Sequence, residues 1–173
     1  MMANMTMLIT EEEIDKRCSD LGMEITKAYE GKSIHVIAVL TGSVFFACEL
    51  TKYIMRPVTF DFITASSYGN STESSGEVKV LKDLVSDIEG KDILIIEDII
   101  DSGRTLKKLK EMLLERKPNS IKICTMLDKP ERRVVDVDVD YVAFKIPDKF
   151  VVGYGLDYTD GTMRNLPYIA TME

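Results

Sequence analysis

The residues best suited to chemistry lie in one stretch, residues 92–106, which reads DILIIEDIIDSGRTL. Its unbroken apolar run suits a strand buried on both faces of a parallel sheet, and the carboxylates of Glu97 and Asp98 end that run. A polar turn at 101–105 follows, and beyond it leucines recur at helical spacing. Because the first amides of a helix are unpaired and attract anions, the turn predicts a phosphate site at the carboxyl end of a central strand.

The chain carries neither of the two most familiar phosphate-binding motifs. It contains no G-x-x-x-x-G-K-[ST] and no G-x-G-x-x-G, so its sequence does not place it with the P-loop or dinucleotide-binding proteins. Residues 97–106 instead match, position by position, the phosphoribosyl-pyrophosphate signature of type I phosphoribosyltransferases: two acids, two apolar residues, Asp, Ser or Thr, Gly, any residue and Thr. The stretch therefore resembles that family. The alternative is an ordinary strand, acidic turn and helix of an α/β protein.

The resemblance implies a role for each polar residue of this stretch. Glu97 and Asp98 would bond the ribose hydroxyls, one of them through water on a bound Mg2+, and the magnesium would neutralise the departing pyrophosphate. Asp101 would be the general base that accepts the proton of the purine N7. Its structural interpretation, a helix N-cap, is compatible with that role. The 5-phosphate would be cradled by the turn residues Asp101, Ser102, Gly103, Arg104 and Thr105.

Two further segments resemble pyrophosphate-binding parts of the same family. Thr41 and Gly42, within LTGS, match a loop that helps to bind pyrophosphate. Thr41 stands where Lys is often found, so backbone amides would have to suffice there. The resemblance also implies that Asp157 holds a metal ion on the pyrophosphate and that Arg164 contacts the pyrophosphate itself. The spacer between these two residues is one residue longer than is usual.

The C-terminal part of the chain resembles the purine-binding segments of hypoxanthine phosphoribosyltransferases. Lys129 follows an apolar strand and would donate to the exocyclic oxygen of hypoxanthine or guanine, since a lysine donor cannot satisfy the amino group of adenine. Phe150 would stack on the purine, and the backbone of Val151 would bond its edge. The alternatives are a solvated surface lysine and a core phenylalanine.

Residues 66–76, SSYGNSTESSG, are rich in Ser, Gly, Asn and Thr, which predicts a flexible loop. The resemblance implies a lid that closes over the substrate, with Ser67 and Tyr68 as its Ser-Tyr pair. A plain connection between two strands is the alternative.

These motifs require a scaffold that brings the ends of several strands together. At 173 residues the chain fits a single domain, 1–173. The resemblance implies an α/β type I phosphoribosyltransferase fold, with a mainly parallel twisted sheet flanked by helices and a small hood from the N- and C-terminal segments. Strands are predicted at 34–40, 58–65, 77–84, 93–96, 120–127 and 141–146, and helices between 11 and 31, over 44–53 and from 106 to about 117.

Two short patterns bear on packing. Thr10 and Glu13 form a capping box that starts the first helix. Residues 134–140 alternate strictly between apolar and acidic side chains, and the apolar ones face either a core or a partner subunit. This pattern and the family together predict a homodimer or homotetramer.

The net charge of −7 argues against broad nonspecific binding to nucleic acid or membrane. No apolar run approaches the roughly 20 residues that span a bilayer, and the first residues do not form a signal peptide, so a cytoplasmic protein is expected. Cys18, Cys48 and Cys124 are expected to be buried, reduced thiols, and His35, inside a predicted strand, is expected to be structural.

The reaction implied by the resemblance transfers ribose 5-phosphate from phosphoribosyl pyrophosphate to hypoxanthine, and also to guanine, giving IMP or GMP and pyrophosphate. Three alternatives stay open. One is a sibling enzyme that uses xanthine or a pyrimidine, another is an RNA-binding regulator on the same fold, and the third is a phosphate-sensing module without catalysis. A basic face on the oligomer would favour the regulator, whereas the intact Asp101 and Asp157 disfavour the sensing module.

Overall fold

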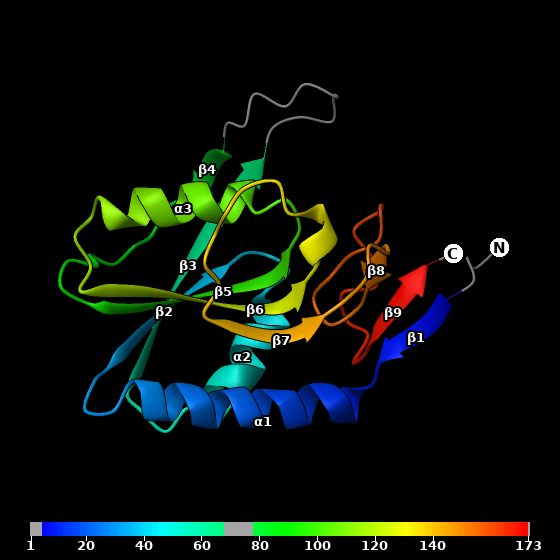
Figure 1. Cartoon of the computed structure of the whole chain (residues 1–173), viewed down its shortest axis with the longest axis horizontal. Coiled ribbons are helices and arrows are strands. Elements are labelled where there is room, and N and C mark those ends of the chain that lie inside the picture. Colours follow the sequence, from blue (N-terminus) through cyan, green and yellow to red (C-terminus); the bar gives the residue numbers. More distant parts are fainter. Residues whose placement is uncertain (1–4, 68–77, 173) are drawn as a thin grey trace.

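The computed structural model of the chain describes residues 5–67 and 78–172, and a six-stranded sheet forms its centre (Figure 1). The strands of this sheet are β2 (Ile34–Val39), β3 (Val58–Ser67), β4 (Val78–Lys82), β5 (Asp92–Ile100), β6 (Ser120–Asp128) and β7 (Tyr141–Lys145). Their order is β4-β3-β2-β5-β6-β7. All neighbours pair in parallel except β3 and β4, which are antiparallel, so β5 lies near the middle of the sheet.

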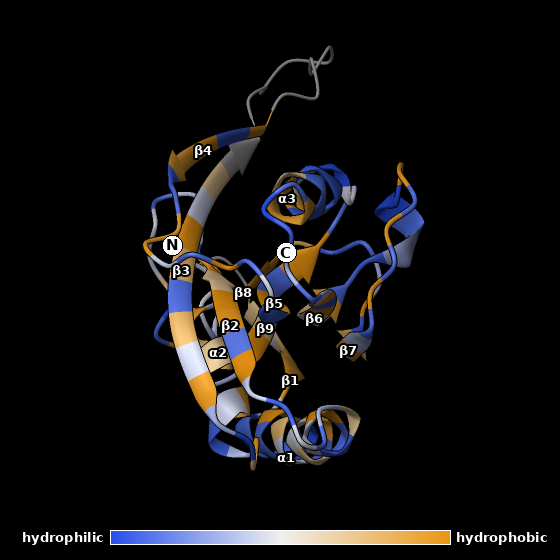
Figure 2. Ribbon diagram, turned by 90° about the vertical axis from the view of Figure 1, so that its left-hand side faces the viewer, coloured by the Kyte–Doolittle hydropathy of each residue, from blue (hydrophilic) through white to orange (hydrophobic). Residues whose placement is uncertain are grey.

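Helices cover both faces of this sheet. Helices α1 (Glu11–Ala28) and α2 (Val44–Lys52) lie on one face, and α3 (Arg104–Leu114) lies on the other. Figure 2 shows hydrophobic strands between α1 and α3, where two buried clusters form the core. The predicted α/β class, a mainly parallel sheet flanked by helices, is confirmed. In the two stretches that the structure describes, no helix is both long and apolar enough to cross a membrane.

A small second sheet is built from segments near the two chain ends. Its strands are β1 (Met5–Ile9), β8 (Val151–Val152) and β9 (Ile169–Met172), in the order β1-β9-β8 with antiparallel pairing. Met5 pairs with Met172, so the two ends of the described part of the chain lie side by side. Figure 1 shows this sheet beyond the arrowheads of β5, β6 and β7, at the carboxyl edge of the large sheet.

The capping box predicted at the first helix is confirmed. The Thr10 N–H donates to Glu13 Oε2 at 2.8 Å, and the Glu13 N–H donates to Thr10 Oγ1 at 3.2 Å. Each bond satisfies an amide that the helix itself leaves unpaired. The apolar stripe behind it, which includes Ile14, Leu21 and Ile25, is buried, and this fixes α1 against the sheet.

The central motif differs from its prediction at both ends of the turn. Strand β5 does not end at Ile96; it continues to Ile100, because main-chain pairing with β6 persists past the acids. Helix α3 begins at Arg104, and the residue before it, Gly103, occupies the N-cap position with a φ of 82°. The structural interpretation of Asp101 as a helix N-cap is therefore wrong.

The acidic and apolar alternation at 134–140 does not form a regular strand. Val137 and Val139 pack against the core cluster beneath α3, so these two valines face the core. Val134, in contrast, is 59% exposed. Strand β7 begins only at Tyr141, where parallel pairing with β6 is regained.

One cysteine differs from its expected burial. Cys18 and Cys124 are buried free thiols, but Cys48 is exposed. Helix α2 turns Phe46, Ala47 and Leu50 toward the core, which leaves Cys48 on its outer side. Burial, with smaller contributions from nearby carboxylates, raises the pKa of the Cys18 thiol to about 12, so this thiol stays protonated at neutral pH.

His35 lies in β2, opposite Thr59 of β3, as a structural residue would. Its Nδ1 is 2.7 Å from Thr59 Oγ1, and the side chain is buried. Burial is the main cause that lowers the pKa of His35, so the neutral ring is the form that fits this strand.

Asp61 is expected to stabilise the fold in a pH-dependent way. Its carboxylate is buried and accepts hydrogen bonds from the N–H groups of Val85 at 2.9 Å and Ser86 at 2.7 Å. Burial raises its pKa, but these and other hydrogen bonds outweigh burial and hold the pKa below its ordinary value. Because the folded pKa is depressed, the contribution is complete above the unfolded value of about 3.9 and is lost as pH falls through the folded value.

Asp61→Ala is therefore expected to lower the free energy of unfolding by about 1–3 kcal/mol at pH 7, since the N–H groups of Val85 and Ser86 lose a buried, charged acceptor. The difference in the free energy of unfolding between the variant and the unsubstituted chain should become smaller below about pH 4. Urea unfolding at several pH values measures this. Asp87→Ala, at an exposed carboxylate that accepts from the Glu89 N–H, is the matched control. A difference independent of pH would contradict the assignment.

Candidate active site

Two adjoining cavities lie at the carboxyl edge of the large sheet. The larger, about 280 Å3, takes its lining from the end of β2, the end of β5, the start of α3 and a loop near the C-terminus: Val39, Leu40, Thr41, Gly42, Ala65, Glu97, Asp98, Ile99, Thr105, Asp157 and Arg164. The smaller, about 90 Å3, is lined by Glu97, Ile99, Ile100, Asp101, Ser102, Gly103, Thr105 and Leu106. Because Glu97, Ile99 and Thr105 line both, the acid pair lies between the predicted phosphate turn and the predicted pyrophosphate residues.

The acid pair is strongly desolvated. Burial, together with the adjacent Asp98 carboxylate, raises the pKa of Glu97. Burial also raises the pKa of Asp98, although Glu97, the Ile99 N–H and Arg164 oppose the shift. Two adjacent carboxylates in a buried site repel each other, so a cation or a set of hydroxyl donors would stabilise their ionised forms.

The donor set fits Mg2+ bound together with a phosphate ligand. Magnesium prefers oxygen ligands and usually takes only one or two carboxylates, with water and substrate phosphates completing its octahedron. Among residues 5–67 and 78–172, no group of three or more His, Cys, Asp or Glu side chains is placed to hold a metal. A site formed by Glu97 and Asp98 is thus of the kind that needs the substrate to complete it.

A glycine permits the closest contact in the site. A Cβ on Gly42 would lie 1.5 Å from Asp98 Oδ2, so only glycine lets this loop approach the carboxylate. On the other side, a Cβ on Gly155 would lie 2.0 Å from the Gly42 carbonyl oxygen. The Leu40–Thr41 peptide bond is cis. Strand β5, the Thr41–Gly42 loop and the C-terminal loop therefore meet at Gly42.

Arg164 reaches the cavity despite its longer spacer. Its Nη1 donates to the Gly155 carbonyl oxygen at 2.6 Å, and its Nη2 lies 2.9 Å from Asp157 Oδ2. The Gly155 N–H in turn donates to the Arg164 carbonyl oxygen at 2.9 Å. These contacts close the loop on itself and place both Asp157 and Arg164 at the larger cavity.

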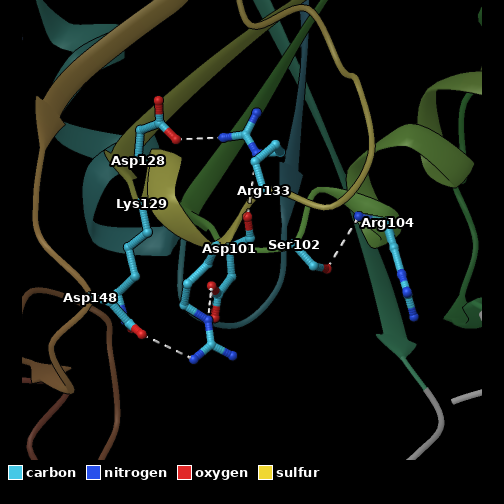
Figure 3. Close-up of polar contacts among 8 residues, drawn as sticks. Asp101, Ser102, Arg104, Asp128, Lys129, Arg133 and Asp148 are labelled. Atoms are coloured by element: carbon cyan, nitrogen blue, oxygen red, sulfur yellow. Dashed lines mark hydrogen bonds and ion pairs between the residues drawn. The ribbon is translucent and has the colours of Figure 1, made fainter. Parts of the chain in front are cut away.

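A chain of ion pairs links Asp101 to Lys129 (Figure 3). Arg132 Nε lies 2.5 Å from Asp101 Oδ1, and Arg132 Nη1 lies 3.4 Å from Asp148 Oδ2. Lys129 Nζ lies 3.7 Å from the other oxygen of Asp148. The Lys129 side chain is only 9% exposed, so the alternative of a solvated surface lysine is wrong.

Arg132 and Asp148 are partners of the predicted site that sequence reasoning missed. Both lie in turns with several charged residues, 128–133 and 147–149, and nothing in their spacing sets them apart. The contacts of Arg132 with Asp101 and with Asp148 depend on how β5, β6 and β7 bring their ends together. The two carboxylates, Asp101 and Asp148, raise the pKa of Arg132, so this guanidinium stays charged.

The remaining predicted residues lie in three places. Phe150 is 48% exposed and meets Tyr158 edge-on with ring centroids 5.9 Å apart, so the alternative of a core phenylalanine is wrong. Val151 is buried in β8. At the start of α3, the Arg104 N–H lies 3.4 Å from Ser102 Oγ. Ser67 ends β3. Tyr68 and the rest of the predicted lid, 68–76, lie outside the described residues.

Comparison with known proteins agrees with this geometry. Residues 6–159 match the family model described as the phosphoribosyl transferase domain. The chain is 52% identical to a hypoxanthine-guanine phosphoribosyltransferase of Staphylococcus aureus and 51% identical to that of Streptococcus mutans; each match covers 96% of this chain and 92% of the relative. A crystal structure of a hypoxanthine-guanine phosphoribosyltransferase from Bacillus anthracis has a TM-score of 0.92, 51% identity, and coverage of 96% of this chain and 98% of that one. The chain therefore belongs to the phosphoribosyltransferase family.

Proposed function

We propose that the protein is a purine-salvage enzyme that transfers ribose 5-phosphate from phosphoribosyl pyrophosphate to hypoxanthine and guanine, releasing pyrophosphate. The observation that carries the proposal is that the buried Glu97 lines two adjoining cavities, one also lined by residues 101–103 and the other also lined by its neighbour Asp98, by Gly42 and by Arg164. The relatives named hypoxanthine-guanine phosphoribosyltransferase support it, and they give no support to an RNA-binding regulator or a xanthine-preferring sibling.

The ribosyl donor would be held across both cavities. Amides and hydroxyls of the turn from Asp101 to Thr105 bind the 5-phosphate, and Glu97 and Asp98 hold the ribose hydroxyls. Backbone amides of Thr41 and Gly42, together with the Arg164 guanidinium, bind the pyrophosphate. Glu97 and Asp98 would hold Mg2+ at the ribose, and Asp157 would hold Mg2+ at the pyrophosphate, where the positive charge would stabilise the leaving group.

The purine would be selected by one donor and one ring. The Lys129 ammonium donates to the exocyclic oxygen, and its burial beside Asp148 keeps it in one place. Phe150, half exposed, stacks on the base, while the Val151 backbone bonds the base edge. Asp101 accepts the N7 proton as the bond between the purine and ribose forms.

The whole-chain organisation follows from the same proposal. Residues 1–173 form one domain, with a lid at about 66–76 that closes with Ser67 and Tyr68 and a hood from the N- and C-terminal segments. The enzyme works as a homodimer or homotetramer in the cytoplasm, with no membrane or nucleic-acid partner.

Turnover tests the proposal directly. The chain is incubated with phosphoribosyl pyrophosphate, Mg2+ and one of hypoxanthine, guanine, xanthine, adenine or uracil, and nucleotide monophosphate is measured. Product is expected from hypoxanthine and guanine. Adenine should be inert because Lys129 cannot satisfy its amino group, and uracil should be inert because a pyrimidine has no N7 from which Asp101 could accept a proton. Omission of Mg2+ is expected to abolish product. If no base gives nucleotide monophosphate, the enzyme assignment is refuted. If xanthine is preferred, the stated specificity is refuted.

A further inference from the structure

Arg133 lies where strand β6 meets the phosphate turn, and its side chain joins the two. Its Nη2 forms an ion pair with Asp128 Oδ1, at the last residue of β6, and its Nε donates to the Asp101 carbonyl oxygen at 3.3 Å. The side chains of Arg133 and Asp128 are 21% and 11% exposed, so this contact is largely removed from water. Figure 3 shows the guanidinium between Asp128 and Asp101.

The segment 129–135, which contains Arg133, also binds the carbonyl groups of the residues before and after Asp101. The Lys129 N–H donates to the Ile100 carbonyl oxygen at 3.0 Å, and the N–H groups of Val134 and Val135 donate to the Ser102 carbonyl oxygen at 3.1 and 3.3 Å. Three consecutive carbonyl groups, those of residues 100, 101 and 102, are therefore bonded toward residues 129–135. The middle one is held by a side chain, that of Arg133.

The direction of a carbonyl group fixes the direction of the next amide. In a planar trans peptide the C=O and the following N–H point to opposite sides. With carbonyl groups 100 to 102 turned toward residues 129–135, the N–H groups of Asp101, Ser102 and Gly103 turn away from that segment. The smaller cavity, lined by residues 100–103, is the anion site that such a row of amides would serve.

We propose that Arg133, held by Asp128, is a positioning residue that orients the Asp101–Ser102 peptide so that its amide binds the 5-phosphate of the ribosyl donor. This rests on the proposed function and extends it to a residue that lines neither cavity. Packing supports the assignment, because a Cβ on Gly103 would lie 2.9 Å from Arg133 Cδ, so the side chain lies directly against the turn. Lysine could not replace it, since a single ammonium cannot serve both acceptors with the geometry of a planar guanidinium.

The test uses Arg133→Lys and Asp128→Asn in the full chain. For Arg133→Lys, the KM for phosphoribosyl pyrophosphate and the Kd for ribose 5-phosphate are both expected to rise about 10- to 100-fold, the range seen when a side chain that orients a metal ligand is lost. The KM for hypoxanthine should stay within about twofold, because the proposed contacts to the base come from the Lys129 ammonium, Phe150 and the Val151 backbone and not from the Asp101–Ser102 peptide. Asp128→Asn should shift the same two quantities in the same direction, and the double variant should show less than the product of the single effects, since both act through one contact.

Arg116→Lys is the matched control. Arg116 also pairs with a carboxylate, its Nη2 lying 2.8 Å from Asp83 Oδ2, but it is at the far end of α3 from the turn. The Arg116→Lys variant is expected to have a changed melting temperature but an unchanged KM for phosphoribosyl pyrophosphate and an unchanged Kd for ribose 5-phosphate. A purely structural role for Arg133 would give the same result as this control, and that would overturn the proposal.

Two failures can be told apart. The titration with ribose 5-phosphate needs neither a base nor turnover. If the unsubstituted chain binds ribose 5-phosphate but makes no nucleotide, the proposed function fails while the role of Arg133 is still tested. If turnover is normal and Arg133→Lys retains its affinity for ribose 5-phosphate, the positioning role alone is refuted.

Discussion

Asp101→Asn is expected to lower kcat by about 10²- to 10⁴-fold, the usual contribution of a positioned general base. The asparagine keeps the size of the side chain and leaves the backbone contacts of residue 101 in place, but it cannot accept a proton from the purine. Binding of nucleotide product should therefore change little. Steady-state turnover with hypoxanthine, together with titration of IMP into the variant, measures both quantities.

Asp83→Asn is the control for this variant, because it also removes a carboxylate paired with an arginine, at 2.8 Å, outside the cavities. It is expected to retain normal kcat. If Asp101→Asn loses turnover and IMP binding by the same factor, residue 101 would be structural and the general base would have to be sought elsewhere.

Gly42→Ala is expected to lower kcat/KM for phosphoribosyl pyrophosphate by about 100-fold, the effect of displacing a reacting group by about 1 Å. The added Cβ would lie 1.5 Å from Asp98 Oδ2 and 2.6 Å from Asp98 Cγ. The loop and the carboxylate cannot both stay where they are. Either the pyrophosphate loop moves away or the acid pair does, and both groups bind the same substrate in the proposed function.

Gly90→Ala separates this effect from general destabilisation. Gly90 has a φ of 70° with nothing within 4 Å of the added Cβ, so its substitution costs about 1–2 kcal/mol of backbone strain and creates no clash. Its kcat/KM should match that of the unsubstituted chain at temperatures where both are folded. A Gly42→Ala variant with normal kcat/KM would show that the close approach to Asp98 has no role in catalysis.

Much of the fold could be predicted because buried strands appear in the sequence as runs of apolar residues. The apolar run at 34–40 contains β2, and β5 contains the run at 93–96; every residue of β2 is buried, and so is the run at 93–96. The family motif placed Glu97, Asp98 and the turn after them at one edge. It could not give the end of β5, because main-chain pairing with β6 does not stop where the side chains become acidic.

Other features depend on contacts between segments far apart in sequence. The ion pair between Arg132 and Asp101 forms only because β5 and β6 end at the same edge of the sheet. The exposure of Cys48 depends on which side of the short helix α2 meets the sheet, and that helix is apolar on more than one side. Sequence spacing carries no information on either point.

The pairing of β1 with β9 bears on the order in which the site is assembled during synthesis. Met5 can pair only after Met172, near the end of the chain, has been synthesised. Val151 likewise pairs with Thr171, in the same sheet. Contacts between such distant residues close late, because the entropy of closing the intervening chain must be overcome first. The strands and helices between residues 11 and 145 can assemble earlier from shorter connections. A nascent chain would therefore complete its phosphate turn before the segment proposed to bind the purine is secured.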